Sequence, residues 1–392
     1  MFYQRSIFPA LQDHLSTRQI TVLTGMRRTG KTTLLKKLIE ISHISQKIFF
    51  DLERIDNREF FSEKNYETII YALTQRGIRF SEKVLIGIDE IQLVPNLPSV
   101  IKYLYDTYDI KFILTGSSSY YLKNHFSESL AGRKKIFEVY PLTFQELLTF
   151  KNVPYLPVGD FTQHPFIGAE YERLKSFYNE YIDYGGFPEV VLSDKIADKK
   201  DMISDIMSSY INFDLTGLAD IKRSVDVYSL IKLLAVRVGS RLEISKLSAI
   251  TGMSRTAVEN YLHLFEQTYL IRTIPVTSKS PDREIVKARK LFFLDNGMAS
   301  SSAELSSGSK FENAVFNQLH HHGEVSYFSL KTGNEIDFIL NKEKAFEVKE
   351  SPLETDLTKT ALLAKNLDIT SVFVIGRHIH RPFPGMIWGG FL

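Results

Sequence analysis

The feature that most constrains this chain is a glycine-rich spacing near its N-terminus. Four residues separate Gly25 from Gly30, and Lys31 and Thr32 follow at once. A short apolar run at 19–23 precedes the spacing, and a segment with helical periodicity follows it. A strand, a tight glycine turn and a helix in this order let backbone N–H groups surround phosphate oxygens, and this context distinguishes a P-loop from a chance match. We therefore predict a P-loop within an α/β fold.

The residue types in the loop predict its chemistry. We expect the Lys31 ammonium to contact the β- and γ-phosphates of ATP and the Thr32 hydroxyl to ligate Mg²⁺. The alternative is an ordinary glycine turn with a solvated lysine, and the flanking strand and helix argue against it. The residues predicted to contact the nucleotide in this loop are Gly25, Arg28, Thr29, Gly30, Lys31, Thr32 and Thr33.

A second motif supports the first. The apolar run 84–88 ends in Asp89 and Glu90. We expect Asp89 to hold Mg²⁺, directly or through water, and Glu90 to orient or deprotonate the attacking water, so hydrolysis of ATP is predicted as well. Ser117 follows the next apolar run, and it either reaches the γ-phosphate or caps the following helix.

The distribution of apolar runs predicts the domain organisation. Continuous runs suit strands buried on both faces of a parallel sheet, and they lie at 19–23, 48–51, 84–89 and 111–115. Prolines and a glycine at 151–170 indicate a linker, and the chain is then helical to about residue 275 and strand-rich from Leu291. We expect a parallel-sheet ATPase domain, a helical lid with a winged helix, and a C-terminal α/β nuclease-like domain, at 1–160, 161–285 and 286–392.

Composition limits the partners and the compartment. The net charge is only +2 over 392 residues, so nucleic-acid binding requires local basic patches. No apolar run approaches the roughly 20 residues of a membrane-spanning helix. The N-terminus lacks the pattern of a signal peptide, and cysteine is absent. We expect a cytoplasmic protein with no membrane contact.

Five segments together resemble a prokaryotic family of AAA+ ATPases that is similar to archaeal-type and STAND-like ATPases and carries a C-terminal domain of unknown function. They are GMRRTGKT (25–32), IDEIQ (88–92), LTGSS (114–118), LAGR (130–133) and YPLTFQEL (140–147). The likeness runs over nearly the whole chain. It implies an AAA+ fold that either forms a homo-oligomer or rests as a monomer.

The resemblance also gives two residues a role that their local pattern does not. Arg133 alone would be a surface arginine, whereas the family implies an arginine that senses nucleotide or acts on a neighbouring copy. Two glycines before Pro188 would ordinarily end a helix. STAND-like ATPases carry a similar Gly-x-Pro element against the nucleotide base, which implies that Pro188 contacts the nucleotide.

Residues 240–275 have the pattern of a winged helix-turn-helix. Residues 241–249 predict a first helix, 251–253 a tight turn, and Ser254 the cap of a second helix. The core face predicted for that helix is Ala257, Val258, Tyr261, Leu262, Phe265 and Tyr269. The residues predicted to face outward are Arg255, Thr256, Glu259, Asn260 and His263.

Two functions fit this element. The outward face would read a major groove while a basic wing grips phosphates. The alternative is a module that packs against protein, and Glu259 favours it because a carboxylate is repelled by phosphate. The basic residues assigned to the wing are Lys279, Arg283, Lys287, Arg289 and Lys290.

A different constellation lies near the C-terminus. Alternate residues of a strand share a face, so Glu347 and Lys349 point the same way, with Asp337 on an adjacent strand and Glu312 on a preceding helix. The set resembles the signature of the PD-(D/E)xK nucleases. That resemblance implies that Asp337 and Glu347 bind Mg²⁺, that Glu312 assists, and that Lys349 positions the water for phosphodiester cleavage.

Two hypotheses for the whole chain remain. In the first, ATP turnover drives binding or processing of double-stranded DNA. In the second, a STAND-like signalling or scaffold ATPase uses the nuclease-like domain as a non-catalytic interaction module. Surface Glu–Lys pairs are common, so the C-terminal pattern alone does not decide between cleavage and binding.

Overall fold

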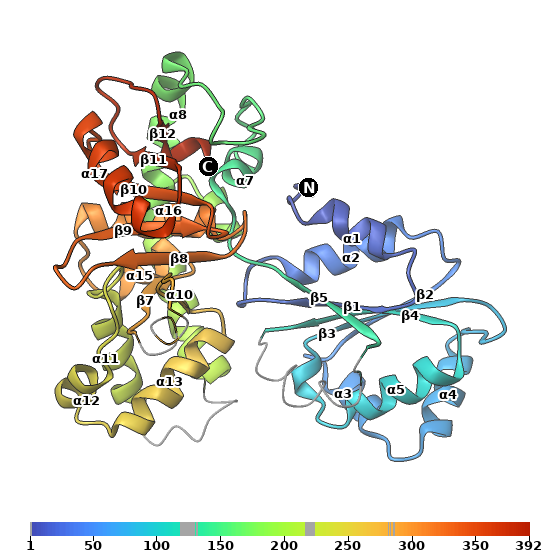
Figure 1. Ribbon diagram of the computed structural model, residues 1–392. Coiled ribbons are helices and arrows are strands. Elements are labelled where there is room, and N and C mark those ends of the chain that lie inside the picture. Colours follow the sequence, from blue (N-terminus) through green and yellow to red (C-terminus); the bar gives the residue numbers. More distant parts are fainter. Residues whose placement is uncertain are drawn as a thin grey trace. The chain divides into compact units, whose positions relative to one another are not determined.

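The computed structural model describes most of the chain, in two compact units (Figure 1). The described residues are 2–117, 130, 132–215, 224–280, 282, 284 and 287–392. The first unit comprises Met1–Tyr140, Asn212–Asp220 and Gln267–Tyr269. The second comprises Pro141–Ile211, Ile221–Glu266 and Leu270–Leu392. Ser118, Ala131 and Arg283, which belong to predicted motifs, lie outside the described residues.

The first unit is built on a five-stranded parallel sheet. Its strands are β1 (Ile20–Thr24), β2 (Gln46–Asp51), β3 (Val84–Asp89), β4 (Ile110–Gly116) and β5 (Lys134–Glu138). They pair in the order β2-β3-β4-β1-β5, and every pairing is parallel. The predicted parallel sheet is confirmed. Because all carboxyl ends lie at one edge, the ends of β1, β3 and β4 meet there.

Helices cover both faces of this sheet. Figure 1 shows α1 (Phe8–His14) and α2 (Lys31–Ile41) on one face, and α3 (Ile55–Ser62), α4 (Tyr66–Gln75) and α5 (Leu97–Thr107) on the other. A short 3-10 helix, η1 (Ile91–Leu93), follows β3. The continuous apolar strands fit this arrangement because both of their faces are buried.

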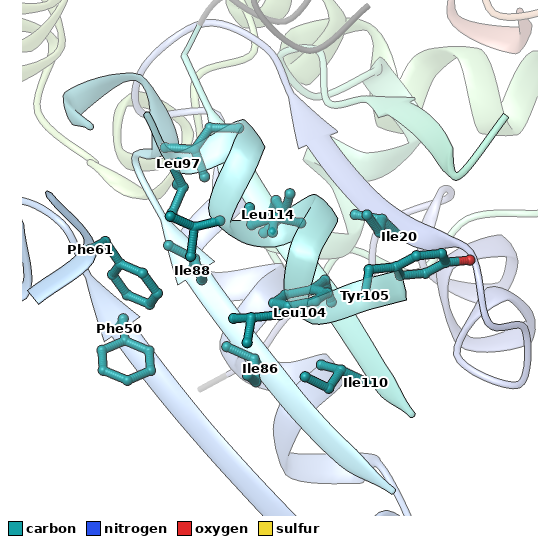
Figure 2. Packing of buried hydrophobic residues seen from close by; sticks show 14 of the residues in the cluster. Ile20, Phe50, Phe61, Ile86, Ile88, Leu97, Leu104, Tyr105, Ile110 and Leu114 are labelled. Carbon is teal, nitrogen blue, oxygen red and sulfur yellow. The ribbon is translucent and has the colours of Figure 1, made fainter. Parts of the chain in front are cut away.

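Strand β3 shows how the layers are held. All six of its residues are buried, and alternate side chains enter opposite cores. Ile86 and Ile88 join the cluster beneath α5, while Leu85 joins the cluster beneath α1 and α2. Figure 2 shows Leu97 and Leu104 of α5 beside these isoleucines. The packing fixes the end of β3, and with it Asp89.

The second unit begins with helices. They are α7 (Phe144–Phe150), α8 (Gly168–Tyr184), α9 (Pro188–Leu192), α10 (Ile196–Ser209), α11 (Ser224–Ala235), α12 (Ile244–Thr251) and α13 (Arg255–Gln267). A π-helical turn, η2 (Tyr210–Leu215), follows α10. A two-stranded antiparallel sheet, β6 (Ile271–Ile274) and β7 (Lys290–Phe293), comes after α13. None of the described helices is long and apolar enough to cross a membrane.

A mixed sheet completes the second unit. Its strands are β8 (Val325–Ser329), β9 (Glu335–Leu340), β10 (Lys344–Lys349), β11 (Ser371–Gly376) and β12 (Met386–Trp388), in the order β12-β11-β10-β9-β8. Strands β8, β9 and β10 pair antiparallel, whereas β10, β11 and β12 pair parallel. Further helices described in this unit are α15 (Asn296–Ser302), α16 (Ser307–Leu319), α17 (Glu354–Ala364), η3 (Lys365–Leu367) and η4 (Gly389–Phe391). The expected C-terminal α/β architecture is present.

The two helices and the turn between them are present, with two differences from the prediction. Tyr269, predicted on the core face of the second helix, lies beyond the end of α13 with a φ of 63°. The first helix begins at Ile244, because the residues before it pair with β7 and the Leu242 N–H donates to the Arg289 carbonyl at 2.8 Å. Gly252 forms the left-handed turn, and the Ser254 hydroxyl caps α13 by accepting from the Ala257 N–H. In α13, Val258, Leu262 and Phe265 are buried, whereas Ala257 and Tyr261 are half-buried. All five residues predicted to face outward are exposed.

The segment predicted as a linker, 151–170, is irregular up to α8 but packs within the second unit. Phe161 is buried there, and the Lys344 ammonium lies 3.5 Å from Asp160. The change of unit instead follows Tyr140. The division into three domains stays a prediction.

Candidate functional site

The glycine-rich loop joins β1 to α2, as the sequence predicts. β1 ends at Thr24 and α2 begins at Lys31. A Cβ atom on Gly25 would lie 2.2 Å from the Val139 carbonyl oxygen, so only glycine fits. Gly30 caps α2 with a φ of 94°, which favours glycine too. The two glycines of the motif therefore meet two distinct backbone requirements.

Lys31 is buried at the centre of this loop. Its Nζ donates to the carbonyl oxygens of Gly25 at 2.8 Å and Met26 at 2.7 Å. Burial lowers the pKa of Lys31, and the charges of Glu90, Asp214 and Asp89 partly oppose that shift. The ammonium is thus held by neutral acceptors inside the loop, where phosphate oxygens can replace the two carbonyls.

Asp89 lies at the end of β3 among hydroxyl groups. Thr115 of β4 donates a short hydrogen bond to its carboxylate, and Thr32 also donates to it. Burial raises the pKa of Asp89, and these two hydrogen bonds partly counter the rise. The structure therefore brings together Thr32 and Asp89, the two residues predicted to hold Mg²⁺.

Glu90 follows in a strained backbone conformation, with a φ of 56°. Its N–H donates to the Thr115 hydroxyl at 3.1 Å. The Gln92 amide donates to the Glu90 carboxylate in a short hydrogen bond, and to the Ser117 hydroxyl at 3.1 Å. A buried Ser117 and a half-buried Glu90 are thus linked through Gln92. Thr115 and Gln92 stand in the quoted segments, but sequence reasoning gave them no role.

The sequence patterns gave no role to three charged residues beside the loop: Arg5, Arg27 and Asp214. The buried Arg5 guanidinium donates to the Thr29 carbonyl at 3.0 Å and the Tyr140 carbonyl at 2.8 Å, which ties the loop to the strand ends. Arg27 Nε lies 2.8 Å from the carboxylate of Asp214. Asp214 is buried, and burial raises its pKa although Arg27 and Lys31 oppose the rise. No local pattern marks Asp214, which is 187 positions from Arg27.

The donor set fits magnesium. Thr32 and Asp89 offer a hydroxyl and a carboxylate, the oxygen ligands of a hard cation, and they already hydrogen-bond to one another. In the described part of the chain, no three acidic or imidazole side chains form a metal site by themselves. A Mg²⁺ ion held by Thr32 and Asp89 would complete its ligand shell with phosphate oxygens and water.

Three other residues predicted to contact the nucleotide are at least partly exposed: Arg28, Thr33 and Pro188. Arg28, with a φ of 63°, and Thr33 are exposed at the loop. Pro188 begins α9 in the second unit, and its contact with a nucleotide stays a prediction. The preceding glycines have a packing role, since the Gly186 N–H donates to Asp295 at 2.7 Å and a Cβ on Gly185 would lie 2.2 Å from the same carboxylate.

Arg133 lies at the opposite edge of the sheet from the loop. It directly precedes β5, and its carbonyl accepts from the N–H of Ile20 at the start of β1. Its guanidinium is bidentate with Asp106, at 2.9 and 3.1 Å. Arg133 therefore lies at the end of β1 that is away from the glycine-rich loop.

The predicted C-terminal residues gather in the second unit, in what we call the carboxylate cluster: Glu312, Glu335, Asp337 and Glu347. Lys349 Nζ lies 2.6 Å from Glu347, which confirms that the two share a face of β10. The Val348 N–H of β10 donates to Asp337 of β9 at 2.8 Å. Sequence reasoning did not include Glu335.

A lysine occupies the middle of this cluster. Lys290 Nζ lies 3.6 Å from Glu312, 3.0 Å from Glu335 and 3.8 Å from Asp337. Burial alone would lower the pKa of Lys290, but the three carboxylates outweigh burial and raise it. Lys290 was predicted to grip phosphates as part of a wing. That prediction is wrong, because the side chain is buried and paired.

Burial raises the pKa of three of these carboxylates, Glu312, Asp337 and Glu347. Burial, reinforced by the charge of Asp337, raises the pKa of Glu312 to about 8 and that of Glu347 to about 7. Asp337 and Glu347 are oxygen ligands of the kind Mg²⁺ prefers. Glu312 faces Lys290 instead, so the full ligand set that the nuclease resemblance implies does not fit a metal while Lys290 is in place.

Of the other basic residues assigned to the wing, two also make internal contacts. Arg289 donates to the Thr273 hydroxyl at 2.7 Å and its carbonyl at 2.9 Å. Lys287 donates to the Ser329 carbonyl at 3.0 Å. Lys279 is mainly exposed and pairs with Asp368. The wing therefore presents fewer cations to a phosphate backbone than the sequence suggests.

Comparisons with known proteins support the fold described for the first unit. Residues 17–148 match the AAA domain family, and residues 175–309 match a domain of unknown function, DUF8612. The loop, Asp89 and Glu90 all lie inside the first match. The fold and the family match thus define the class: the chain carries a P-loop domain with an AAA+ fold, followed by a second α/β unit.

Relatives span most of the chain. An uncharacterized protein of Haemophilus influenzae is 28% identical over 356 residues, which are 86% of this chain and 85% of that protein. Protein MJ1544 of Methanocaldococcus jannaschii, also uncharacterized, is 29% identical over 377 residues, 91% of this chain and 81% of its own length. Their names assign no activity.

Solved structures are more distant. The Aeropyrum pernix ORC1 protein in complex with DNA is 13% identical with a TM-score of 0.32, covering 77% of this chain and 92% of its own. The ADP form of Aeropyrum pernix ORC2 is 14% identical with a TM-score of 0.39, covering 74% and 90%. At these scores neither structure supports an argument about function.

Proposed function

We propose that this protein binds ATP with Mg²⁺ and hydrolyses it, and that turnover controls DNA binding or processing by the second unit. The observation that carries the first part is the meeting of three strand ends. Lys31 follows β1, Asp89 ends β3 with Glu90 directly after it, and Ser117 follows β4. All four side chains therefore line one edge of the sheet.

Each residue has a definite task in this scheme. The Lys31 ammonium exchanges its carbonyl acceptors for β- and γ-phosphate oxygens, and the N–H groups at the start of α2 add hydrogen bonds. Thr32 and Asp89 hold Mg²⁺, which neutralises charge on the phosphates. Glu90, fixed by Gln92 and Thr115, accepts a hydrogen bond from the attacking water and orients it.

Glu90→Gln tests the assignment. The variant should bind ATP as tightly as the wild type and hydrolyse it roughly a thousandfold more slowly, because the amide cannot act as a base. Binding is read by calorimetry, and hydrolysis by phosphate release in a single turnover. Glu82→Gln, an exposed carboxylate paired with Arg79, is the matched control. Wild-type turnover in Glu90→Gln would assign the water to another residue.

DNA contact is supported by the exposed face of α13. Arg255, Thr256 and Asn260 offer donors and acceptors on one helix surface, and a β-hairpin follows that helix. Arg255→Ala and Asn260→Ala should weaken duplex retardation, whereas Lys175→Ala on α8 should not. Retardation that none of these changes alters at moderate salt would remove α13 from the interface.

A second candidate is a signalling or scaffold ATPase whose second unit docks a partner without cutting nucleic acid. Lys290 within the carboxylate cluster favours it. Plasmid incubated with ATP and Mg²⁺ or Mn²⁺ separates the two. Nicking that Asp337→Ala and Lys349→Ala both abolish supports DNA processing, and intact plasmid supports the scaffold.

Arg133 leads to a proposal about assembly. Since it lies away from its own nucleotide loop, any role in catalysis requires a second copy of the chain. Copies carrying Lys31→Met, mixed with copies carrying Arg133→Ala, should then regain hydrolysis that neither variant shows alone. Full activity of Arg133→Ala by itself would leave Arg133 with its Asp106 contact only.

A further inference from the structure

We propose that Lys290 is the resident cation of the carboxylate cluster and that its ammonium excludes a divalent metal ion. The cluster then works as a closed, lysine-neutralised site in the wild-type protein. This inference concerns the second unit and does not depend on hydrolysis of ATP by the first.

The contacts of Lys290 support the first half of the proposal. Its ammonium lies within 4 Å of carboxylates on two elements, 3.6 Å from Glu312 of α16 and 3.8 Å from Asp337 of β9. Its side chain is only 2% exposed, so the ammonium itself has little contact with solvent, whereas the Glu335 side chain is 33% exposed. The ring of Tyr327 lies 5.4 Å from Nζ and closes another side with a cation–π contact.

The backbone of Lys290 is fixed on both edges. On one edge it pairs with Ile274 in the β6–β7 hairpin, and on the other it forms a bridge with Arg241. The Leu291 N–H donates to the Ser240 carbonyl at 3.1 Å on that second edge. Withdrawal of the ammonium by a strand shift would break both pairings. The cation is therefore built into the fold.

Charge explains why a metal and this lysine compete. Four carboxylates of the cluster face three cationic side chains, Lys290, Arg241 and Lys349. Mg²⁺ requires an octahedral shell of oxygen ligands, and an ammonium beside the same oxygens repels it. A divalent ion that binds here must displace the protons that burial holds on Glu312 and Glu347. With all four carboxylates then ionised, removal of Lys290 leaves two net negative charges, which one divalent ion neutralises.

The experiment compares metal binding to nucleotide-free wild-type protein and to Lys290→Met, which keeps the length of the side chain without its charge. Mn²⁺ binding is measured by electron paramagnetic resonance of the free ion. Lys290→Met should bind one Mn²⁺ at least tenfold more tightly than the wild type, and Asp337→Asn in that background should abolish the gain. Lys287→Met, three positions away, is the control and should match the wild type.

Three outcomes would overturn the proposal. One is tight Mn²⁺ binding by the wild type that Asp337→Asn removes. Another is folded Lys290→Met protein that binds no more Mn²⁺ than the wild type. The third applies if Lys290→Met does not fold without metal. Mn²⁺ present during refolding should then restore the folded protein, and failure to restore it contradicts the proposal. ATP affinity, measured in the same samples, reports on the first unit separately.

Discussion

The two units each bury a lysine at their chemical centre, and the two lysines behave oppositely. Lys31 donates to backbone carbonyls, and burial lowers its pKa. Lys290 contacts three carboxylates, whose charges outweigh burial and raise its pKa. A cation among neutral acceptors gains when an anion arrives, whereas a cation among carboxylates is already paired. The first site is therefore ready for a ligand, and the second is filled by the chain itself.

The largest effect should come from removing the paired lysine. Lys290→Met leaves Glu312 and Asp337 without a counter-ion, which should lower the free energy of unfolding of the second unit by about 3 kcal/mol. The single tryptophan, Trp388, is buried in that unit and reports unfolding by fluorescence in denaturant. Lys287→Met should lose no more than about 1 kcal/mol. Equal losses of unfolding free energy in the two variants would mean that the contacts of Lys290 with the carboxylates stabilise the unit no more than the contacts of Lys287 do.

The corresponding experiment in the first unit is Lys31→Met. It should weaken ATP binding about a hundredfold, because charge-assisted contacts with the phosphates are lost. Stability should change little, since the ammonium contacts only neutral carbonyls in the absence of nucleotide. Lys36→Met, at an exposed position of the same helix, is the matched control. Calorimetry measures affinity, and unchanged ATP binding in Lys31→Met would contradict the assigned site.

A third buried lysine extends the comparison to pH. Lys111 of β4 donates to the His14 carbonyl at 2.8 Å, and burial, with a smaller contribution from Lys83, lowers its pKa from 10.5 to about 7. Between these values the unfolded chain binds more protons than the folded one. The contribution of Lys111 to stability therefore rises with pH from about 7 to 10, on the order of 1 kcal/mol per pH unit.

Hydrogen exchange of the amides in β1 and β4 measures this dependence. The difference between wild type and Lys111→Met isolates the lysine from other titrating groups. The variant should show a flatter pH profile and higher stability at pH 7. A constant difference between the two proteins from pH 7 to 9 would mean that the buried lysine is charged throughout.

The smallest effect concerns Asp214, which shares the surroundings of Lys31. Asp214→Asn removes a buried negative charge that acts on Lys31, so ATP affinity should rise roughly fivefold, on the order of 1 kcal/mol. Asp106→Asn, which breaks the Arg133 pair at the other sheet edge, is the control. Weaker ATP binding in Asp214→Asn would instead make the Arg27–Asp214 pair a support for the loop.

The sequence was sufficient for features that neighbouring residues encode. The turn at Gly25 and Gly30, the start of α2 and the end of β3 depend on spacing within a few residues, so the sequence predicts these local elements, while their contact with a nucleotide stays a prediction. The shared face of Glu347 and Lys349 follows from strand alternation alone. Strand β5 was not predicted, and the position of Arg133 at the far edge of the sheet became clear only from its parallel pairing with β1.

Tertiary structure decided which charges meet. Lys290 lies in a polar, basic stretch that resembles a wing, and only the pairing of β7 carries it to Glu312 and Asp337. Asp214 reaches Arg27 across 187 positions. The physical reason is that backbone conformation responds to adjacent residues, whereas the state of a buried charge depends on groups that the fold brings from elsewhere in the chain.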